Sequence, residues 1–174
     1  IVTVTDDGTL VVDTAFPNFV SLPRTLTDGG GFTWDIQTDG RIGNGTDGAF
    51  GGGLDWIVPS FGTYGYAVAE DGDREVRIGP FATYSYPDLR LSRKVFVPAN
   101  DRFVRYLEII ENTGDDEATL TLTVRTNLGT AADSRILTTS TGDAIFNTFD
   151  DYIITADAGT GIQPVVVHFF SGEY

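Results

Sequence analysis

The sequence has no cysteine and no methionine, and its 174 residues include one histidine, His168, and one lysine, Lys94. The absence of cysteine excludes disulfides, thiolate metal sites and a thiol nucleophile. With a single histidine, most catalytic triads and zinc sites cannot be built. Carboxylates are plentiful, but no pattern singles out a glycosidase pair. His168 itself lies in an apolar strand pattern, which favours an imidazole packed in a core or interface. We therefore predict no catalytic site.

Positive charge is also scarce. Eleven Lys and Arg stand against 25 Asp and Glu, which gives a net charge of −14 and a pI near 4.1. Repulsion from phosphate then argues against nucleic acid as a partner, and against an anionic membrane surface. No run of 18 apolar residues exists, so we predict no membrane insertion. An acidic, lysine-poor composition suits a salt-rich or calcium-rich exterior, and it equally suits an ordinary soluble acidic protein.

Helical periodicity is absent, since no window shows apolar residues repeating at i, i+3, i+4 and i+7. Thr, Val, Ile, Phe and Tyr are frequent instead, and clusters of Gly and Asp separate short apolar runs. A hydrophobic content of 41% is enough to form a core. We predict an all-β fold with almost no helix, an antiparallel β-sandwich of about a dozen short strands. We treat residues 1–174 as one such module.

The clearest strand pattern runs from Leu89 to Thr130, and it predicts three consecutive strands joined by two polar turns. The last of these, residues 119–125, alternates apolar Leu and Val with Thr and Arg, as a strand with one buried face does. Residues 103–110 are apolar on both faces, which predicts a central strand covered on two sides. Between them, Gly114 lies in a turn rich in Asn and Asp.

Two hairpins are also predicted, each with an acidic turn. One joins residues 1–5 to 9–12 across an Asp-Asp-Gly turn, and the other joins 64–69 to 74–78. The sequence begins and stops inside strand patterns. We therefore expect a module of a longer or assembled polypeptide, located outside the cell or on its surface.

The most unusual segment is the Gly-rich loop, residues 39–55, which contains seven glycines, more than a regular strand tolerates. Its side chains offer hard oxygen ligands, and its glycines let backbone carbonyls converge, as Ca²⁺ requires. The spacing differs from that of an EF-hand loop. Calcium is thus a candidate cofactor, and the alternative is a long connection between strands. The candidate metal ligands are Asp39, Asn44, Asp47 and Asp55.

Aromatic residues flank the same loop. Trp34 precedes it, Trp56 follows it, and Tyr64 and Tyr66 come soon after. Exposed rings of this kind stack on the faces of sugars, so these four residues are a candidate glycan site. The alternative is that the indoles pack in the core of the sandwich.

Basic residues cluster elsewhere, within sixteen positions of this acidic chain. If they share a face, they form a basic stripe for an acidic ligand or for the acidic surface of a neighbouring copy. The alternative is local pairing with Glu108, Glu111 and nearby Asp residues. The residues of this candidate interface are Arg90, Arg93, Lys94, Arg102 and Arg105.

Three runs of the sequence carry a resemblance: RKVFVPANDRFVRYLEIIENTGDDEATLTLTVRTNLGT, the upstream DIQTDGRIGNGTDGAFGGGL and the downstream DDYIITADAG. Together they resemble uncharacterised all-β modules of large secreted or surface-attached bacterial and archaeal proteins. The first run also looks like strands of the β-supersandwich found beside carbohydrate-active enzymes. The resemblance covers about residues 34–170 and consists of strand and turn motifs without a catalytic signature. It implies an extracellular, non-enzymatic role.

Two functions follow as hypotheses. The first is an extracellular structural or adhesive module that assembles with other copies or neighbouring modules, because open edge strands invite strand addition. The second is a carbohydrate-binding or carbohydrate-enzyme accessory domain, with glycans as partners, that uses Trp34, Trp56 and the Gly-rich loop.

Overall fold

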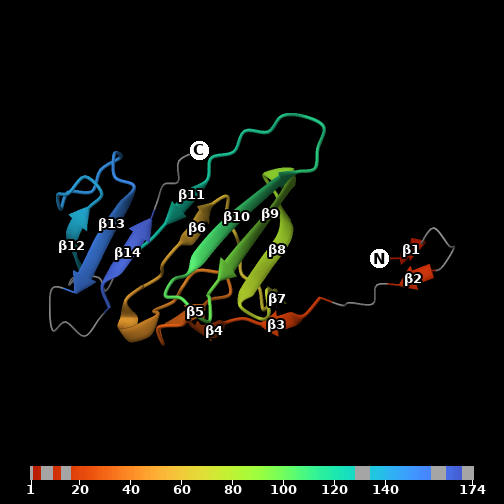
Figure 1. The fold of residues 1–174 in the computed structure, drawn as a ribbon. Coiled ribbons are helices and arrows are strands. Elements are labelled where there is room, and N and C mark those ends of the chain that lie inside the picture. The colour runs from red at the N-terminus through yellow and green to blue at the C-terminus, as the bar shows by residue number, and fades with distance from the viewer. Residues whose placement is uncertain (1, 5–9, 13–16, 128–133, 158–163, 170–174) are drawn as a thin grey trace.

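The computed structural model describes residues 2–4, 10–12, 17–127, 134–157 and 164–169 (Figure 1). These residues form fourteen strands and one short 3₁₀ helix, and every strand pairing is antiparallel. The predicted all-β, sandwich-like fold with almost no helix is therefore confirmed. No helix in the described part of the chain is long and apolar enough to cross a membrane.

A five-stranded sheet dominates the molecule, with the strand order β10-β9-β8-β7-β3. Its two longest strands, β8 and β9, pair with each other in the middle of the sheet. β10 pairs with β9 in an unbroken register, from Arg105 opposite Phe96 to Asn112 opposite Leu89. The strands are β3 (Phe19–Ser21), β7 (Tyr66–Glu70), β8 (Glu75–Thr83), β9 (Tyr86–Phe96) and β10 (Arg105–Asn112). The predicted second hairpin is β7 with β8, and it is confirmed.

Two small sheets accompany the five-stranded sheet, and we call the three sheets together the body. The small sheets are β4 (Arg24–Thr27) with β5 (Thr33–Ile36), and β6 (Asp55–Val58) with β11 (Thr123–Arg125). The Gly-rich loop connects β5 to β6 and contains the 3₁₀ helix η1 (Thr46–Gly48). Ile42 anchors this loop, because it bridges to Ile36 on one side and to Gly53 on the other.

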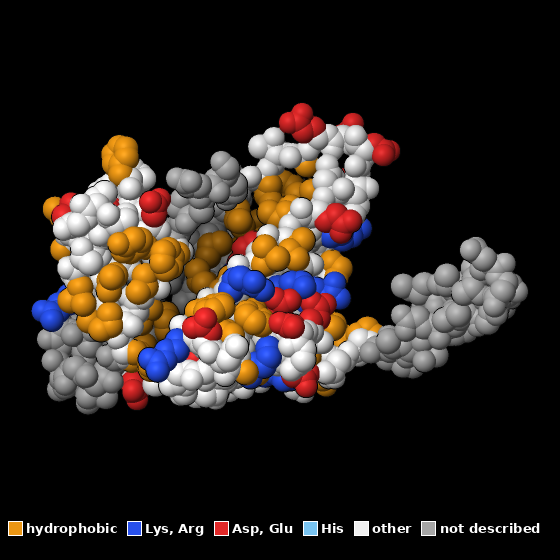
Figure 2. Space-filling model, in the orientation of Figure 1, with side chains coloured by type: hydrophobic (Ala, Val, Ile, Leu, Met, Phe, Trp, Pro, Cys, Tyr) orange, Lys and Arg blue, Asp and Glu red, His pale blue; other side chains and the backbone are white. Residues whose placement is uncertain are grey.

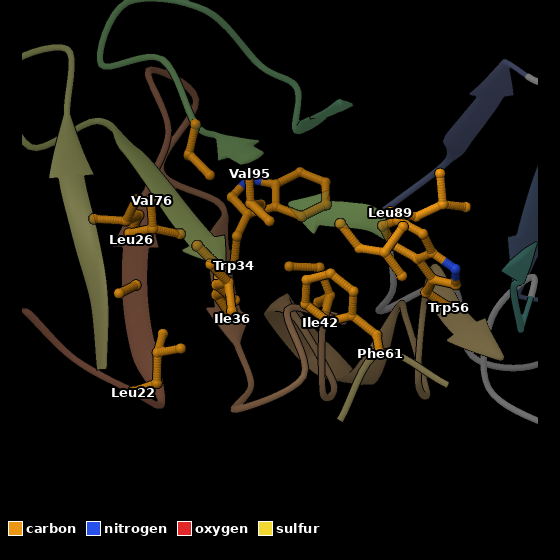
Figure 3. Packing of buried hydrophobic residues seen from close by; sticks show 14 residues of the cluster. Leu22, Leu26, Trp34, Ile36, Ile42, Trp56, Phe61, Val76, Leu89 and Val95 are labelled. Carbon is orange, nitrogen blue, oxygen red and sulfur yellow. The ribbon is translucent and has the colours of Figure 1, made fainter. Parts of the chain in front are cut away.

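The core lies against one face of the five-stranded sheet. Alternation along the strands decides the faces, so Val76 and Ile78 of β8 point inward while the intervening Arg77 is only partly buried. Trp34 packs among the aliphatic residues near Val95, and Trp56 lies beside Leu89 and Phe61 (Figure 3). Each aliphatic side chain buried here contributes roughly 1.5–3 kcal/mol.

The rest of the chain forms two separate sheets. The C-terminal sheet has the order β12-β13-β14, with β12 (Ser134–Thr139), β13 (Tyr152–Asp157) and β14 (Val166–Phe169). The predicted first hairpin is present as β1 (Val2–Val4) with β2 (Leu10–Val12). Among the described residues, this hairpin pairs with no other strand.

Two predictions about Leu89–Thr130 are corrected. The third strand is short, since only Thr123–Arg125 is extended and paired, and its partner is β6. After β10 the chain turns away, held by the Thr113 N–H and hydroxyl, which both donate to the Asp88 carbonyl. In addition, β10 is an edge strand and not a central one. Its two-sided apolar pattern leaves Leu107 49% exposed and Ile110 40% exposed.

Candidate functional site

One carboxylate shapes the Gly-rich loop, and it is Asp35, at the end of β5. Its Oδ1 accepts the backbone N–H of Gly45 at 2.7 Å and that of Asn44 at 3.0 Å, and its Oδ2 accepts the Gln37 side-chain amide at 3.2 Å. Gly43 permits this approach, because a Cβ there would lie 2.4 Å from Asp35 Oδ2. The loop is therefore folded back on β5 by internal hydrogen bonds.

The four predicted metal ligands have separate environments. Asp39 pairs with Arg41 at 3.3 Å and Asp55 pairs with Arg125 at 3.2 Å. Asp47 lies in η1 with a positive φ of 54°, and the Asn44 carbonyl accepts the Phe50 N–H. Within the described residues, no three His, Asp or Glu side chains gather as a metal site. The structure thus does not bring the three aspartates together, and calcium stays a prediction.

A polar pocket of about 380 Å³ lies at the end of this loop. It contains two guanidinium groups, one carboxylate and one side-chain amide, and the Asn127 amide donates to the Gly51 carbonyl at 3.0 Å. Both guanidinium groups are already paired with aspartates, so the pocket offers directional hydrogen bonds with little net charge. Its lining is Arg41, Gly51, Gly52, Asp55, Arg125, Thr126 and Asn127.

The two predicted sugar-stacking indoles are in the core, as the alternative interpretation expected. Trp34 is 7% exposed and donates its Nε1–H to Asp28 Oδ2 at 3.0 Å, while Trp56 is 3% exposed and donates to the Val58 carbonyl. Both indoles are therefore almost inaccessible to solvent. Tyr64 packs against core rings, and burial raises its pKa. Tyr66 is exposed, so the four rings form no common platform.

Arg93 of the predicted basic stripe is fully buried, which excludes it from contact with a neighbouring copy. Its Nε donates to both carboxylate oxygens of Glu108, at 3.0 and 3.1 Å. Its guanidinium also lies 5.1–5.6 Å from the ring centroids of Trp56, Phe61 and Tyr106. Cation–π contacts and a bidentate ion pair therefore compensate the buried charge.

Most of the other basic residues pair locally, across the outer face of the five-stranded sheet (Figure 2). Lys94 contacts Glu70 at 2.5 Å and Glu75 at 2.9 Å, and the hydrogen bonds to these glutamates raise its pKa. Arg105 completes the group by contacting Glu75 at 3.3 Å. Arg90 donates to the carbonyls of its own strand. The stripe is therefore mainly a local ion-pair network.

Arg102 is the exception. Its guanidinium has no hydrogen-bond or ion-pair partner in the part of the chain that the structure describes. Its side chain lies across Gly30, where a Cβ would come within 2.6 Å of Arg102 Cγ. It is also part of the wall of an apolar pocket.

This pocket, the apolar groove, has a volume of about 660 Å³ and lies between the body and β14. On the body side, its wall is mainly aromatic, with Phe32, Trp34, Phe50, Phe103 and Tyr106, joined by Arg102. On the other side, all six consecutive residues from 164 to 169 contribute. Successive residues of a strand point to opposite faces of its sheet. Because neighbouring residues of β14 all line the groove, we infer that the groove meets β14 along its edge and not on one face.

His168 is one of the titratable groups that line the groove. Its Nε2 lies 2.9 Å from Thr155 Oγ1, and its ring meets Phe50 edge-on at 6.0 Å. Burial lowers its pKa to about 4, because the neutral imidazole loses less hydration than the cation. His168 is therefore neutral at pH 7, where it acts as a packing and hydrogen-bonding group.

Three carboxylates that the sequence analysis missed organise loops. Besides Asp35, Asp28 accepts the N–H groups of Gly30 and Phe32, and Asp150 accepts those of Thr141 and Asn147. For Asp28, an Asp followed two residues later by Gly was a usable signal, because this spacing is typical of Asx turns. The bonds of Asp35 to Asn44 and Gly45, and that of Asp150 to Thr141, join residues nine or ten positions apart and have no such local signal.

Comparison with known protein families, with curated proteins and with solved structures finds no match for this chain. The resemblance to secreted all-β modules therefore stays a prediction. The features available for a functional interpretation are the open sheet edges, the apolar groove and the polar pocket.

Proposed function

We propose that this protein is a structural or adhesive β-module of an extracellular assembly, which joins other copies or neighbouring modules by strand addition at its sheet edges. The observation that carries the proposal is β10, an eight-residue edge strand with apolar residues on both faces. Such a pattern is typical of a strand covered on two sides. A partner strand would pair the open backbone edge of β10 and would bring its own side chains beside the exposed Leu107 and Ile110.

Edge strands of monomeric proteins are usually protected by Lys, Pro, bulges or short length. β10 contains neither Lys nor Pro, and its pairing with β9 runs without a bulge. Large exposed apolar residues also occur on the other edge strands: Phe19 on β3 is 65% exposed, Leu137 on β12 is 43% exposed and Phe169 on β14 is 73% exposed. These edges support association through strands.

The charge of the chain sets the conditions for assembly. At −14, copies repel each other in dilute buffer, so salt that screens this repulsion favours contact. A salt-rich exterior is the setting in which such a surface associates, and this is why we place the module outside the cell.

The test is the molar mass of the full chain by size-exclusion chromatography with light scattering, across protein concentration and salt. We expect assembly that grows with both, and its loss in Leu107→Lys, because a lysine on the edge opposes strand addition. Tyr84→Lys is the matched control, since it makes the same charge change at a fully exposed position between β8 and β9. A chain that stays monomeric up to its solubility limit would contradict the proposal.

The polar pocket favours glycan binding as a second candidate function. Arg125, Asp55 and Asn127 are planar polar groups that suit sugar hydroxyls, and they lie at the Gly-rich loop. Glycan-array binding that is lost in Arg125→Ala and retained in Arg135→Ala would support it. Binding that is equal in the two variants would remove the pocket from consideration.

A further inference from the structure

We infer that Asn44 is a site of N-linked glycosylation and carries a sugar chain on the Gly-rich loop. The inference rests on the proposed function and makes it specific, because N-linked sugars are a modification of chains that are exported from the cell. It names the residue that is modified and the chemical class of the group that this residue carries.

The sequence contains the acceptor motif once. Asn44, Gly45 and Thr46 form Asn-Xaa-Thr without a proline in the middle, which is the motif for attachment of an N-linked sugar and is typical of surface loops in secreted proteins. The chain has six asparagines, and none of the other five is followed two positions later by Ser or Thr. So short a motif also arises by chance, and its significance depends on whether the amide is accessible in the fold.

The structure separates the amide of Asn44 from those of most other asparagines. Asn44 is exposed, and its side-chain amide has no hydrogen-bond partner in the part of the chain that the structure describes. Four of the other five asparagines use this group inside the fold, where it donates to a carboxylate or a backbone carbonyl. They are Asn18, Asn112, Asn127 and Asn147. A substituent on Asn44 would therefore break no side-chain hydrogen bond of the fold.

The backbone around Asn44 holds this side chain at a defined place on the surface. Its N–H donates to Asp35 Oδ1 at 3.0 Å, and its carbonyl accepts the Phe50 N–H at 2.8 Å. The residues on either side of Asn44 are glycines, so no adjacent side chain crowds a bulky substituent. In Figure 1 the helix η1 of this loop, drawn in orange, lies at the lower edge of the molecule. A sugar chain on the Asn44 amide would extend into solvent.

The Thr46 hydroxyl indicates when the sugar is added. This hydroxyl accepts the Thr33 N–H at 2.6 Å and lies 3.0 Å from the Thr33 hydroxyl. In the folded loop it is therefore already bonded to β5, although it belongs to the acceptor motif. The transfer thus precedes closure of the loop, while the chain is being exported, and the finished fold leaves the modified amide in solvent.

The transfer takes its sugar from a lipid-linked oligosaccharide, which the exporting cell supplies. A bond forms between Nδ2 of Asn44 and the anomeric carbon of the first sugar, and the bond between that carbon and the phosphate oxygen of the lipid breaks. The lipid phosphate leaves with the electron pair, and the amide nitrogen loses one proton. No oxidant or reductant is needed.

The test is mass spectrometry of the full chain, expressed in its own source, collected from the medium or cell surface, then denatured and digested with trypsin. Fragment 42–74 contains Asn44 as its one asparagine, and fragment 95–102 contains Asn100 as its one. We expect a sugar-derived mass on Asn44, its loss in Asn44→Gln and its retention in Asn100→Gln. Asn100 is the matched control because it is also exposed, with an amide that has no partner among the described residues, and it lacks the hydroxyl residue two positions later.

The variants at Thr46 separate the motif from the fold. Thr46→Ser keeps a hydroxyl and should keep the sugar, whereas Thr46→Ala should lose it. An exported chain with an unmodified Asn44, or with its sugar on Thr46 itself, would overturn the inference and leave the proposed function intact. A chain that is found only inside the cell would overturn the extracellular location in the proposed function, and the inference with it.

Discussion

The five-stranded sheet and the C-terminal sheet are built from similar residues, but they bury their apolar side chains to different degrees. We call the five-stranded sheet, whose apolar face is buried, the closed region, and the C-terminal sheet, whose apolar side chains are mostly exposed, the open region. In the larger sheet, one face buries Val76, Ile78, Leu91 and Val95 completely. The opposite face carries the ion-pair network around Lys94. In the C-terminal sheet, Ile153 is the one hydrophobic residue among the described positions that is buried to this extent.

The buried positions of the C-terminal sheet and its loop are otherwise polar, since Thr139, Thr155 and Asp150 are almost inaccessible to solvent while Val167 and Phe169 are exposed. A closed sheet directs its apolar residues to its own core. An open one keeps them at the surface, where they can contact a partner. The comparison therefore separates a region with a large buried core from a region that keeps most of its apolar side chains at the surface.

The largest effect is expected in the closed region, at the Arg93–Glu108 pair. Glu108→Leu leaves a buried guanidinium without its carboxylate and should lower the free energy of unfolding by about 3 kcal/mol. Chemical denaturation followed by tryptophan fluorescence measures this, because Trp56 adjoins Arg93. Glu111→Leu, at an exposed glutamate of the same strand, is the control. Equal losses in the two variants would contradict the buried-pair assignment, and Arg93→Met/Glu108→Leu should recover stability.

In the open region, Ile153→Ala should cost about 2 kcal/mol, as expected for a large-to-small change at a buried site. Both tryptophans lie in the body, so fluorescence reports on the body alone. We expect faster amide hydrogen exchange in β12–β14 with little change in the fluorescence midpoint. Ile78→Ala should instead shift the midpoint. A common shift in both variants would mean that the two regions unfold as one unit.

The stability of the two regions should also depend differently on pH. The pKa of His168 is about 4 in the folded protein and 6.5 as the ordinary value, so the unfolded chain binds the proton more tightly. Stability from this residue is complete above pH 6.5 and is lost as the pH falls toward 4. Allowing for partial exposure, the loss should be about 1 kcal/mol.

Hydrogen exchange in β12–β14 between pH 7 and 4 measures this loss, and His168→Gln should abolish it within that window. Desolvation, the largest single effect, raises the pKa of Asp150. The hydrogen bonds that Asp150 accepts from Asn147, Thr141 and Thr139 outweigh it together, so the pKa lies below its ordinary value of 3.8. Its contribution is therefore lost only at still lower pH. A flat response of β12–β14 in the wild-type chain between pH 7 and 4 would contradict the packing of His168.

The smallest effect should come from the exposed pair of Arg125 and Asp55, which joins β11 to β6. Arg125→Ala should change the free energy of unfolding by no more than about 0.5 kcal/mol, because solvent screens an exposed ion pair. Lys94→Ala, which breaks two contacts in the partly buried network, should cost more. Thermal unfolding of the two variants side by side ranks them.

The sequence predicted well those features that depend on local periodicity. Both hairpins and the all-β fold follow from alternation and from turns rich in Asp and Gly, and these signals lie within a few residues of each other. The pairing of β11 with β6 could not be predicted in this way, because it joins segments that are distant in the chain. The edge position of β10 was missed for a related reason: apolar residues on both faces of a strand do not show which strands lie beside it.

At the candidate sites, residue type predicted chemistry but not accessibility. Trp34 and Trp56 have the rings that sugars stack on, yet the same apolar area drives them into the core. Asp39 and Asp55 have ligand oxygens, yet arginines occupy them. Burial and pairing depend on the whole fold, so the sequence could propose these groups without showing which are available.

The single lysine gives the protein an unusual chemical reactivity. Lys94 is held between two glutamates that raise its pKa, and acylating reagents need the neutral amine. Amine-directed dyes and surface-coupling chemistries should therefore modify this side chain only slowly while the sheet is intact. Lysine-specific proteases should also cut slowly after Lys94, because its peptide bond lies inside β9, which is paired on both sides. A chain immobilised or labelled at Lys94 under mild conditions would report that β9 and its neighbours had opened.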